Sequence, residues 1–374
     1  MVMSSTNNKK RILSGIKPTG TPHIGNYAGM LLPMLQLAAN HADQDVFMFV
    51  ADYHALNNAD ARKNLGPLGR ELTATLLALG FDPKTCTFYR QSDVPEVFEL
   101  ASFLTNFTPK GLMNRSHAYK AAVAAYGTSF TPSDDLKKMM LSEGDKWSPE
   151  TLGRLSVEMQ QHEANADSGI NMGLYNYPIL MAADILLYDI DRVPVGRDQR
   201  QHIEFARDIA GYVNNAYGQD LLKLPEGVYQ ADTQEVPGID GRKMSKSYGN
   251  VLPIFAEAAE VEKIVKKIKT DSTLPAEPKD KDNLLVKFHQ AMSTPEQHAD
   301  FLARFLPGGM GYGDAKKEVM AAHEAKFGKA RDEYKRLMAA PGELDSILKM
   351  GAEKARDVAG PVLRRIRKAA GFSA

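Results

Sequence analysis

Brief apolar runs alternate with longer stretches of helical spacing between residues 11 and 217. The run DVFMFV at 45–50 is continuously apolar, as in a strand buried on both faces of a sheet. Further strands are predicted at 11–16, 85–90 and 192–195, and helices at 23–39, 67–79, 94–107, 110–125, 177–188 and 198–217. This alternation predicts an α/β fold, a Rossmann-like open parallel sheet with helices on both faces.

The chain after residue 253 contains no strand pattern, so we expect an all-helical C-terminal domain. Its predicted helices lie at 255–269, 284–292, 295–305, 315–339 and 344–370. A segment at 126–167, broken by Gly and Pro, carries two capped helical pieces and is interpreted as an insertion lying over the surface. The predicted division is a Rossmann-like domain at 9–232, a mobile loop at 233–253 and the helical domain at 254–374.

The composition is ordinary for a soluble globular protein in a reducing compartment. Of the 374 residues 43% are hydrophobic, and 46 basic residues balance 46 acidic ones, so any RNA partner must be held by local patches. The single Cys86 excludes an intramolecular disulfide and a multi-cysteine metal site, and we predict no metal site. The leader at 1–8 is not a signal peptide, and the most apolar window is too short to span a bilayer. We therefore expect a cytoplasmic location and no membrane partner.

A loop with two lysines, at 241–250, carries the first candidate chemistry. Lys243 and Lys246 are accompanied by the hydroxyls of Ser245 and Ser247, and a glycine stands on each side. Lysines are mobile point charges, and backbone N–H groups and hydroxyls donate to phosphate oxygens, so the loop can wrap an oligophosphate. A solvated charged turn would be enough to explain the two lysines taken alone.

Residues 15–26 are the second candidate, a junction of a strand, a Gly- and Pro-rich loop and a helix. A helix N-terminus offers free N–H groups and partial positive charge to a phosphate. Gly25 lets a flat base or ribose lie against the helix, while His23 and Asn26 can donate to ribose or phosphate oxygens. Taken alone, such a stretch is more often a turn that merely enters a helix.

An acidic residue within an apolar helix is the third candidate. Asp184 stands beside Met181, Ile185 and Leu186, where a buried carboxylate is costly unless a group donates to it. It is either a half-exposed helix carboxylate or an acceptor for the N–H of an apolar ring. His54, at the end of the second strand, fits a core histidine and a pocket residue equally well.

Taken together, these stretches resemble the tryptophanyl-tRNA synthetases of class I. Lys-Met-Ser-Lys-Ser is similar to one class signature, and His-Ile-Gly-Asn to the other, His-Ile-Gly-His, with Asn26 replacing the second histidine. The pattern Ser-Gly-Ile-x-Pro-Thr-Gly-x-x-His-Ile-Gly-Asn-Tyr, the helix with Asp184 and the run Val-Pro-Val-Gly-x-Asp-Gln-x-Gln-His at 193–202 are similar to tryptophan-specific members.

The resemblance implies the roles of individual residues. ATP would be bound by Lys17, Pro18, Thr19, Gly25, Asn26, Gly196, Arg197, Asp198, Val236, Lys243, Met244, Ser245, Lys246 and Ser247. The residues implied in catalysis are Lys243, Lys246, Ser245, Ser247 and His23. Tryptophan would be bound by Asp184, which would accept the indole N–H, and by Met181, Tyr177, Gln199 and His54. His202 is expected to be structural, and the side-chain role of Lys17 is open because many relatives have glutamine there.

The implied activity is that of a tryptophan–tRNA ligase. The L-tryptophan carboxylate would attack the α-phosphorus of ATP, with Mg²⁺ as counter-ion, and the acyl group would pass to the 3′ end of tRNA(Trp). The helical domain would bind the anticodon and the protein would be a homodimer, both by analogy with the family. Basic runs at 263–269 and 364–368 are candidate RNA contacts, although a solvated helix face explains either one. The alternatives are a tyrosyl-tRNA synthetase of the same fold and a catalytically silent relative that binds RNA.

Overall fold

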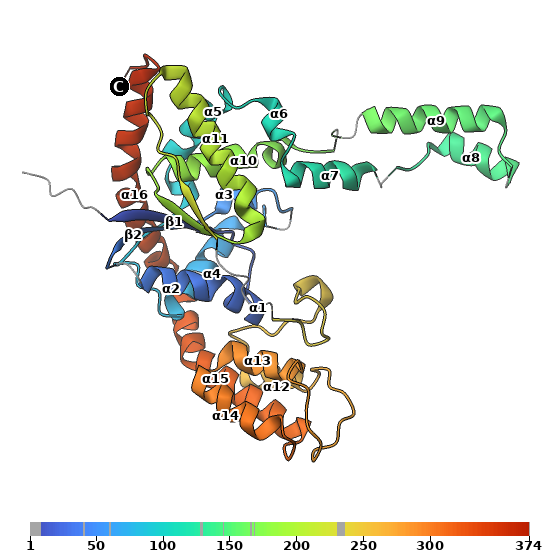
Figure 1. Cartoon of the computed structure of the whole chain (residues 1–374), viewed down its shortest axis with the longest axis vertical. Helices are drawn as coiled ribbons and strands as arrows, with labels where there is room; N and C mark the ends of the chain where they lie inside the picture. The colour runs from blue at the N-terminus through green and yellow to red at the C-terminus, as the bar shows by residue number, and fades with distance from the viewer. Residues whose placement is uncertain are drawn as a thin grey trace, which may run out of the picture.

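Five parallel strands form the centre of the protein. The computed structural model describes residues 9–39, 42–59, 61–127, 130–144, 146–164, 167, 169–229 and 236–373. The strands are β1 (Lys10–Ile16), β2 (Gln44–Val50), β3 (Thr87–Arg90), β4 (Arg192–Val195) and β5 (Glu226–Tyr229), in the order β3-β2-β1-β4-β5 with every neighbouring pair parallel. Helices lie on both faces of this sheet (Figure 1), so the predicted Rossmann-like fold is confirmed.

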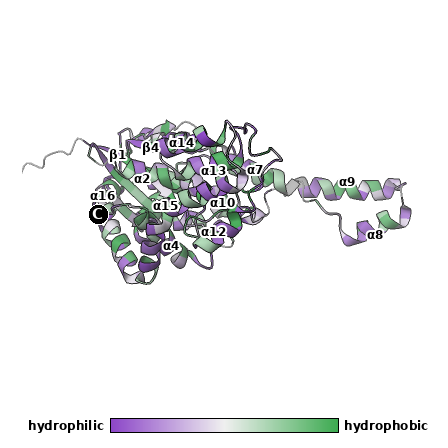
Figure 2. Cartoon of the chain, turned by 90° about the horizontal axis from the view of Figure 1, so that it is seen from below, coloured by the Kyte–Doolittle hydropathy of each residue, from purple (hydrophilic) through white to green (hydrophobic). Residues whose placement is uncertain are grey.

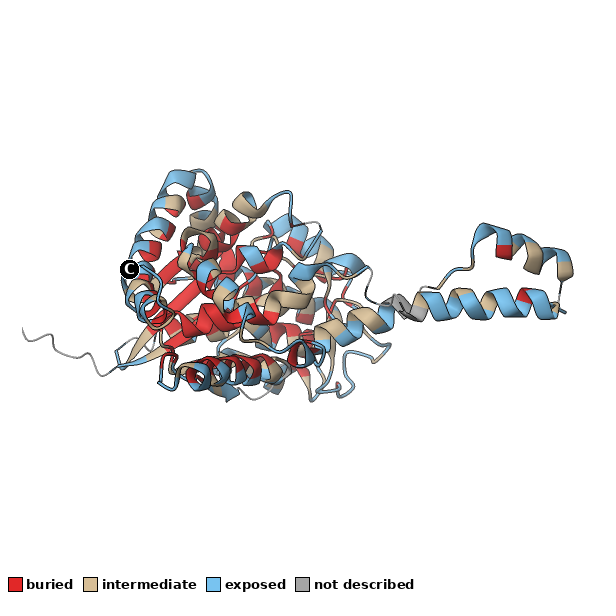
Figure 3. Cartoon of the chain, turned by 90° about the horizontal axis from the view of Figure 1, so that it is seen from above, coloured by how far each residue is buried: buried red, intermediate tan, exposed pale blue. Residues whose placement is uncertain are grey.

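Strand β2 explains why both faces of the sheet are covered. Its buried side chains alternate, so Phe47 and Phe49 belong to the core on one face and Val46, Met48 and Val50 to the core on the other. The first core includes α5 (Glu96–Thr105), α10 (Met172–Leu186) and α11 (Arg200–Tyr217), and the second includes α2 (Leu32–Ala39) and α4 (Leu65–Ala78). Figure 3 shows the sheet among the buried residues. Burial on both sides is what a continuously apolar strand predicts.

The strand order brings three loops to one edge of the sheet. The chain passes from β1 to β2 and β3 on one side, and β4 and β5 lie on the other side, so Ile12 pairs with both Val46 and Arg192. In open α/β sheets, ligands bind beyond the carboxyl ends of the strands at such a reversal of strand order. The loops that follow Ile16, Val50 and Val195 therefore border the expected site.

Two elements of the sheet domain differ from the prediction. The edge strand β5 was not predicted, because it has only four residues and three of them are exposed, which leaves no apolar run to recognise. The helix predicted at 110–125 is interrupted and forms α6 (Lys110–Met113) and α7 (His117–Gly127). Gln201 of α11 stabilises the break, because its side chain accepts the N–H of His117 at 2.8 Å and donates to the carbonyl of Arg115 at 3.0 Å.

The C-terminal part is helical, as predicted, but its last helix returns to the sheet. Helices α12 (Ala258–Val265), α13 (Leu284–Met292), α14 (Pro295–Phe305) and α15 (Tyr312–Met338) lie together, and α16 (Pro341–Ala369) runs from them past the sheet (Figure 1). Ala352, Ala355 and Ala359 of α16 belong to the same core as α5 and α10. The domain limit at residue 254 stays a prediction. Within the predicted helical domain, α16 packs against the edge strand β3 of the Rossmann-like domain. In the described part of the chain, no helix has the length and apolar content that a membrane span requires.

Gly351 lies where α16 meets the backbone of β3. A Cβ atom at this position would lie 1.6 Å from the carbonyl oxygen of Phe88, a backbone atom that is fixed by the pairing of β3 with β2. We expect Gly351→Ala to lower the free energy of unfolding by about 2 kcal/mol or more, although alanine is the better helix former by about 1 kcal/mol.

Urea unfolding followed by circular dichroism measures the change in the free energy of unfolding. Gly342→Ala, in the same helix with nothing within 4 Å of its Cβ, is the control and should not destabilise the protein. Equal stability of the two variants would contradict the close packing.

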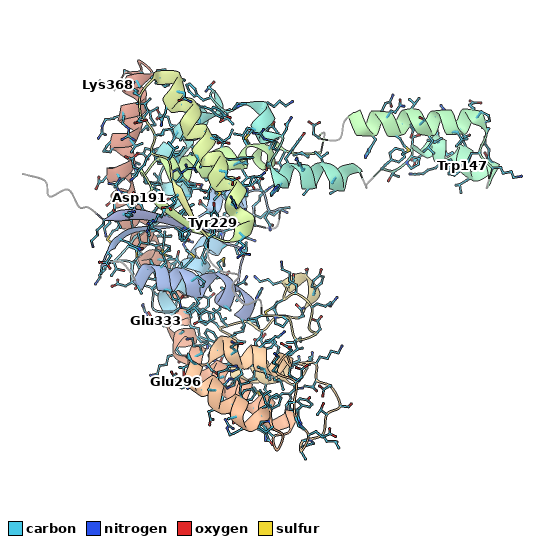
Figure 4. All side chains as sticks on the ribbon, in the orientation of Figure 1. Trp147, Asp191, Tyr229, Glu296, Glu333 and Lys368 are labelled. Atoms are coloured by element: carbon cyan, nitrogen blue, oxygen red, sulfur yellow. The ribbon has the colours of Figure 1, made fainter. Side chains whose placement is uncertain are left out.

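The insertion forms a helical hairpin that stands away from the body. Its helices are α8 (Asp134–Glu143) and α9 (Pro149–Ala164), and Ser133 caps α8 by accepting the N–H of Leu136 at 3.2 Å. Figures 1 and 2 show the hairpin projecting beyond α7, with Trp147 near its tip (Figure 4), so the expectation that it lies over the surface is wrong. The reason is that α8 and α9 pack on each other, which buries Leu136 and leaves Leu141 83% exposed.

Candidate active site

The loop after β1 is fixed by a reciprocal cap at the start of α1 (Ile24–Asn26). His23 Nδ1 accepts the backbone N–H of Asn26 at 3.2 Å, and Asn26 Oδ1 accepts the N–H of His23 at 3.2 Å. This arrangement occupies the orphan N–H groups of a helix start, so the entry to the helix has one defined geometry. His23 and Asn26, both predicted site residues, therefore shape the loop as well as border the site.

A backbone pairing joins this helix start to the segment that follows the lysine loop. The N–H of Ile24 donates to Leu252 O at 2.9 Å, and the N–H of Ile254 donates to Pro22 O at 3.2 Å. Two stretches that are far apart in the sequence thus become neighbours. The sequence contains no local signal for this pairing, because neither stretch is long enough to read as a strand.

Asn250 holds the lysine loop in shape. Its buried side chain donates to Asp240 Oδ1 at 2.8 Å and to Lys243 O at 3.0 Å, and it accepts the N–H of Ser245 at 2.8 Å. Gly238 makes room for it, since a Cβ there would lie 2.1 Å from Asn250 Nδ2. This role of Asn250 was not predicted. The available signal was a polar residue directly after Gly249, whose φ of 62° ends the preceding turn.

The two predicted loops meet through Met244 and Lys246. Met244 is buried, and its sulfur accepts the N–H of Gly25 at 3.4 Å. The ammonium of Lys246 donates to the carbonyl of Thr19 at 3.1 Å. The lysine loop therefore lies directly over the junction of β1 and α1. Ser245 and Ser247 share a hydrogen bond of 2.8 Å between their hydroxyls, and Lys243 and Ser247 are exposed.

A cavity of about 370 Å³ lies between these loops. This size falls within the range of about 300–1,000 Å³ that small-molecule sites occupy. Its lining includes six of the residues predicted to bind ATP or take part in catalysis, namely His23, Gly25, Asn26, Val236, Lys243 and Met244. Arg242 and Lys287 also line it and were not predicted. Cationic side chains around one cavity suit a phosphorylated ligand. The expectation of free N–H groups at the helix start is wrong, because the N–H groups of Ile24, Gly25 and Asn26 donate to Leu252 O, Met244 Sδ and His23 Nδ1.

His23 is buried against this cavity and binds a proton weakly. Burial, followed by the charge of Lys246, lowers the pKa of His23 from 6.5 to about 4. The folded state therefore favours neutral His23, and its contribution to stability is complete above pH 6.5 and lost as the pH falls towards 4. We expect the urea midpoint to fall over this range, and to fall less in His23→Asn, which keeps a capping acceptor. The exposed His117→Asn is the control, and an unchanged pH dependence in His23→Asn would contradict the assignment.

Asp184, on α10, is one of three buried polar side chains that are hydrogen-bonded to one another. The residue is 2% exposed, and its carboxylate accepts from His54 Nε2 at 2.9 Å and from Gln91 Nε2 at 2.9 Å. Burial raises the pKa of the Asp184 carboxyl, and the hydrogen bonds from His54 and Gln91 oppose that shift. This burial rules out the half-exposed helix carboxylate, while the indole-binding role of Asp184 stays a prediction. Gln91 was missed, because a glutamine after a strand carries no distinctive pattern.

Tyr177 of α10, a predicted pocket residue, contacts His202 and Lys17. The Tyr177 hydroxyl is hydrogen-bonded to Nε2 of the buried His202, which gives His202 the structural role that was expected. The ammonium of Lys17 lies 5.9 Å from the centre of the Tyr177 ring, a cation–π distance. Met181 is partly buried against the core of this face. Lys17, which was predicted to bind ATP, is therefore next to Tyr177, which was predicted to bind tryptophan.

The turn after β4 supplies the third edge of the site. Gly196, Arg197, Asp198 and Gln199 form a single 3₁₀ turn, in which the N–H of Gln199 donates to Gly196 O at 3.0 Å. Pro18 is buried and Thr19 exposed in the facing loop after β1. The turn thus lies at the carboxyl end of β4, next to β1, where the reversal of strand order places a ligand.

Comparisons with known proteins agree with this geometry. The family model for class I tRNA synthetases (W and Y) matches residues 5–144 and 151–328. The tryptophan–tRNA ligases of Bordetella parapertussis and Neisseria meningitidis serogroup A are 44% and 41% identical to this chain. Each match covers 97% of this chain and, respectively, 73% and 98% of the relative.

This chain is also similar to solved structures of tRNA synthetases. A tryptophanyl-tRNA synthetase from Campylobacter jejuni, complexed with ADP and tryptophan, is 36% identical with a TM-score of 0.77, covering 97% of this chain and 100% of the other. A tyrosyl-tRNA synthetase from Archaeoglobus fulgidus, 18% identical with a TM-score of 0.52, shares the fold alone. The chain therefore belongs to the class I tRNA synthetases of the tryptophan and tyrosine family.

Proposed function

We infer that this chain is a tryptophan–tRNA ligase. It activates L-tryptophan with ATP to tryptophanyl-AMP and pyrophosphate, then transfers the tryptophanyl group to the 3′ end of tRNA(Trp). The observation that carries this proposal is the meeting of the lysine loop with the β1–α1 junction, while the buried carboxylate of Asp184 lies beyond the neighbouring strand ends. The relatives at 41–44% identity are named as tryptophan–tRNA ligases and support the same assignment.

ATP would lie in the cavity between the two loops. Its base or ribose would rest against Gly25 and its phosphates would face Lys243, both of which line the cavity. Lys246, Ser245 and Ser247 of the same loop are not among the lining residues and would turn to the phosphates when ATP binds. The turn at Gly196–Gln199 and Pro18, Thr19 and Val236 complete the proposed nucleotide contacts. Mg²⁺ would come with the triphosphate as a counter-ion and neutralise part of its charge. That the chain itself holds no metal stays a prediction.

The proposed chemistry depends on alignment and charge stabilisation. A carboxylate oxygen of tryptophan forms a bond to the α-phosphorus while the bond to the pyrophosphate oxygen breaks, so negative charge accumulates on the leaving group. Lys243 and Lys246 stabilise that charge, and the loops hold the reacting atoms in line. Lys246 must exchange the Thr19 carbonyl for a phosphate oxygen when ATP binds, which makes the loop a closing element.

The pocket beyond the nucleotide would bind the indole ring. Asp184 accepts the ring N–H, Met181 flanks the ring, and Tyr177, Gln199 and His54 complete the pocket. A buried charged acceptor left unpaired costs about 1–3 kcal/mol or more, so rings that lack an N–H are rejected. A tyrosine ring carries a phenol O–H in place of a ring N–H, and a phenol needs a different polar partner, which favours tryptophan over the tyrosyl alternative.

Binding of tRNA by the helical part stays a proposal, and the structure narrows its candidate contacts. In the basic run at 364–368, Arg365 pairs with Asp189 at 2.7 Å and Arg367 with Glu99 at 2.8 Å, so this run ties α16 to the Rossmann-like domain. The run at 263–269 is mostly exposed and is the better candidate for RNA. The homodimer and the cytoplasmic location also remain predictions.

Amino-acid-dependent ATP–pyrophosphate exchange across the twenty amino acids tests the proposed function. We expect exchange with tryptophan and at least 100-fold less with tyrosine or phenylalanine, since the site is built around one acceptor for a ring N–H. Faster exchange with tyrosine would favour the tyrosyl alternative. A protein that binds tRNA but exchanges pyrophosphate with no amino acid would favour the silent relative.

A further inference from the structure

A buried glutamine outside the predicted site holds the carboxylate of Asp184. Gln91 begins the 3₁₀ turn Gln91–Asp93 after β3, and it is 0% exposed. Its Nε2 lies 2.9 Å from Oδ1 and 2.9 Å from Oδ2 of Asp184, and its Oε1 accepts the backbone N–H of Tyr53 at 3.2 Å. Because a backbone N–H can only donate, the orientation of the Gln91 amide is fixed, with the NH₂ group towards the carboxylate.

We propose that Gln91 is a specificity-determining positioning residue. It orients the Asp184 carboxylate so that one acceptor site is left for the ring N–H of the amino-acid substrate. This inference rests on the proposed function and adds a residue that does not itself touch the substrate. It makes selectivity for an N–H ring a property of the Gln91–Asp184 pair rather than of Asp184 alone.

The hydrogen-bond geometry indicates which oxygen is open. An ionised carboxylate has about four acceptor sites on its two oxygens. In the part of the chain that the structure describes, Oδ2 accepts from His54 and Gln91, whereas Oδ1 accepts from Gln91. Since a carboxylate oxygen can accept two donors, Oδ1 is the atom with room for an indole N–H.

The turn that carries Gln91 is held independently of any ligand. Buried Asp52 accepts the N–H of Ser92 at 3.1 Å, the Ser92 hydroxyl at 2.5 Å and the N–H of Tyr53 at 3.0 Å. These bonds tie the segment after β2 to the segment after β3. Gln91 is therefore placed by the ends of two strands, and the carboxylate is oriented before substrate binds, which is the condition for strong discrimination.

Loss of the amide donor should affect the N–H preference in particular. Burial raises the pKa of the Asp184 carboxyl, and the Gln91 amide opposes this. Without it the carboxyl group is less firmly oriented and its protonated form gains population, and a protonated acid has one O–H donor and is a weaker acceptor than the ionised form. Substrates that present an N–H then bind a weaker acceptor, while substrates of the same shape without an N–H lose little.

The test compares tryptophan with 3-(benzothiophen-3-yl)alanine, which has sulfur in place of the ring N–H. In Gln91→Met, of similar length but without the donor, we expect kcat/KM for tryptophan in pyrophosphate exchange to fall about 10–100-fold, mainly through KM. The value for the sulfur analogue should change less than about threefold, so the preference for the N–H ring falls at least about threefold. Gln91→Asn, whose amide is one methylene shorter, should also lower the preference for tryptophan over the sulfur analogue. This variant replaces Gln91→Met in the test if Gln91→Met folds poorly. Gln160→Met, the same substitution at an exposed glutamine of α9, is the matched control and should keep the wild-type preference.

The outcomes are distinguishable. A wild-type protein without tryptophan-dependent exchange would overturn the proposed function, whatever the Gln91 variants do. If the wild type exchanges with tryptophan and prefers it to the sulfur analogue, a parallel loss for both substrates in Gln91→Met and Gln91→Asn would overturn this inference. An unchanged preference in both variants would overturn it as well.

Discussion

Replacing Lys246 by alanine is expected to slow formation of tryptophanyl-adenylate about 10²–10³-fold while tryptophan still binds. The Lys246 ammonium lies 3.1 Å from the carbonyl of Thr19, on the loop between β1 and α1, so a short movement brings it to a phosphate in the adjacent cavity. Its charge is needed most when the pyrophosphate leaves. The loss should therefore fall on kcat rather than on the affinity for the amino acid.

Pyrophosphate exchange and equilibrium dialysis with labelled tryptophan separate these two quantities. Lys267→Ala, the loss of an exposed lysine outside the loop, is the control and should leave both unchanged. Exchange at the wild-type rate in Lys246→Ala would count against the assigned role. A loss of tryptophan affinity equal to the loss of rate would indicate that the loop supports the fold of the pocket instead.

Asp184→Asn is expected to lower kcat/KM for tryptophan about 100-fold and to remove most of the preference over phenylalanine. A hydrogen bond to a charged group contributes about 1.5–3 kcal/mol, and an asparagine amide would also place an NH₂ group against the donors His54 and Gln91. The variant retains the shape of the pocket, so the Michaelis constant for ATP should change little.

Competitive exchange with tryptophan and phenylalanine measures the preference, and a thermal melt checks that the variant is folded. Asp208→Asn, an exposed carboxylate of α11, is the matched control and should keep the wild-type preference. A folded Asp184→Asn protein that still selects tryptophan would show that another residue recognises the ring.

The fold was largely predictable from the sequence because its strongest signals are local. The apolar run at 45–50 and the amphipathic stretches each report burial within a single element, and β2 is indeed buried on both faces. Short, exposed β5 gives no such signal. The break before α7 depends on Gln201, which is distant in the sequence. The hairpin projects because α8 packs on α9 rather than on the body of the protein. Pairings of this kind are set by tertiary contacts and cannot be read from one segment.

The site was predictable in its loops and less so in the residues that support them. Lys246, Gly25 and Met244 lie together as the two signatures indicate. Gln91 acts through hydrogen bonds that form only after distant elements meet, so nothing in its own segment marks it. Asn250 bonds within its own loop, and the only sign of its role is its place after Gly249. His54 could be a core or a pocket residue from sequence, and its contact with Asp184 was not predictable because α10 is distant in the sequence.

A crystal structure with tryptophan and a non-hydrolysable ATP analogue tests the central claim most directly. We predict the indole nitrogen within about 2.7–3.2 Å of Asp184 Oδ1, and Lys246 moved from Thr19 to a phosphate oxygen. An indole ring bound away from Asp184, or a triphosphate outside the cavity between the two loops, would contradict the account.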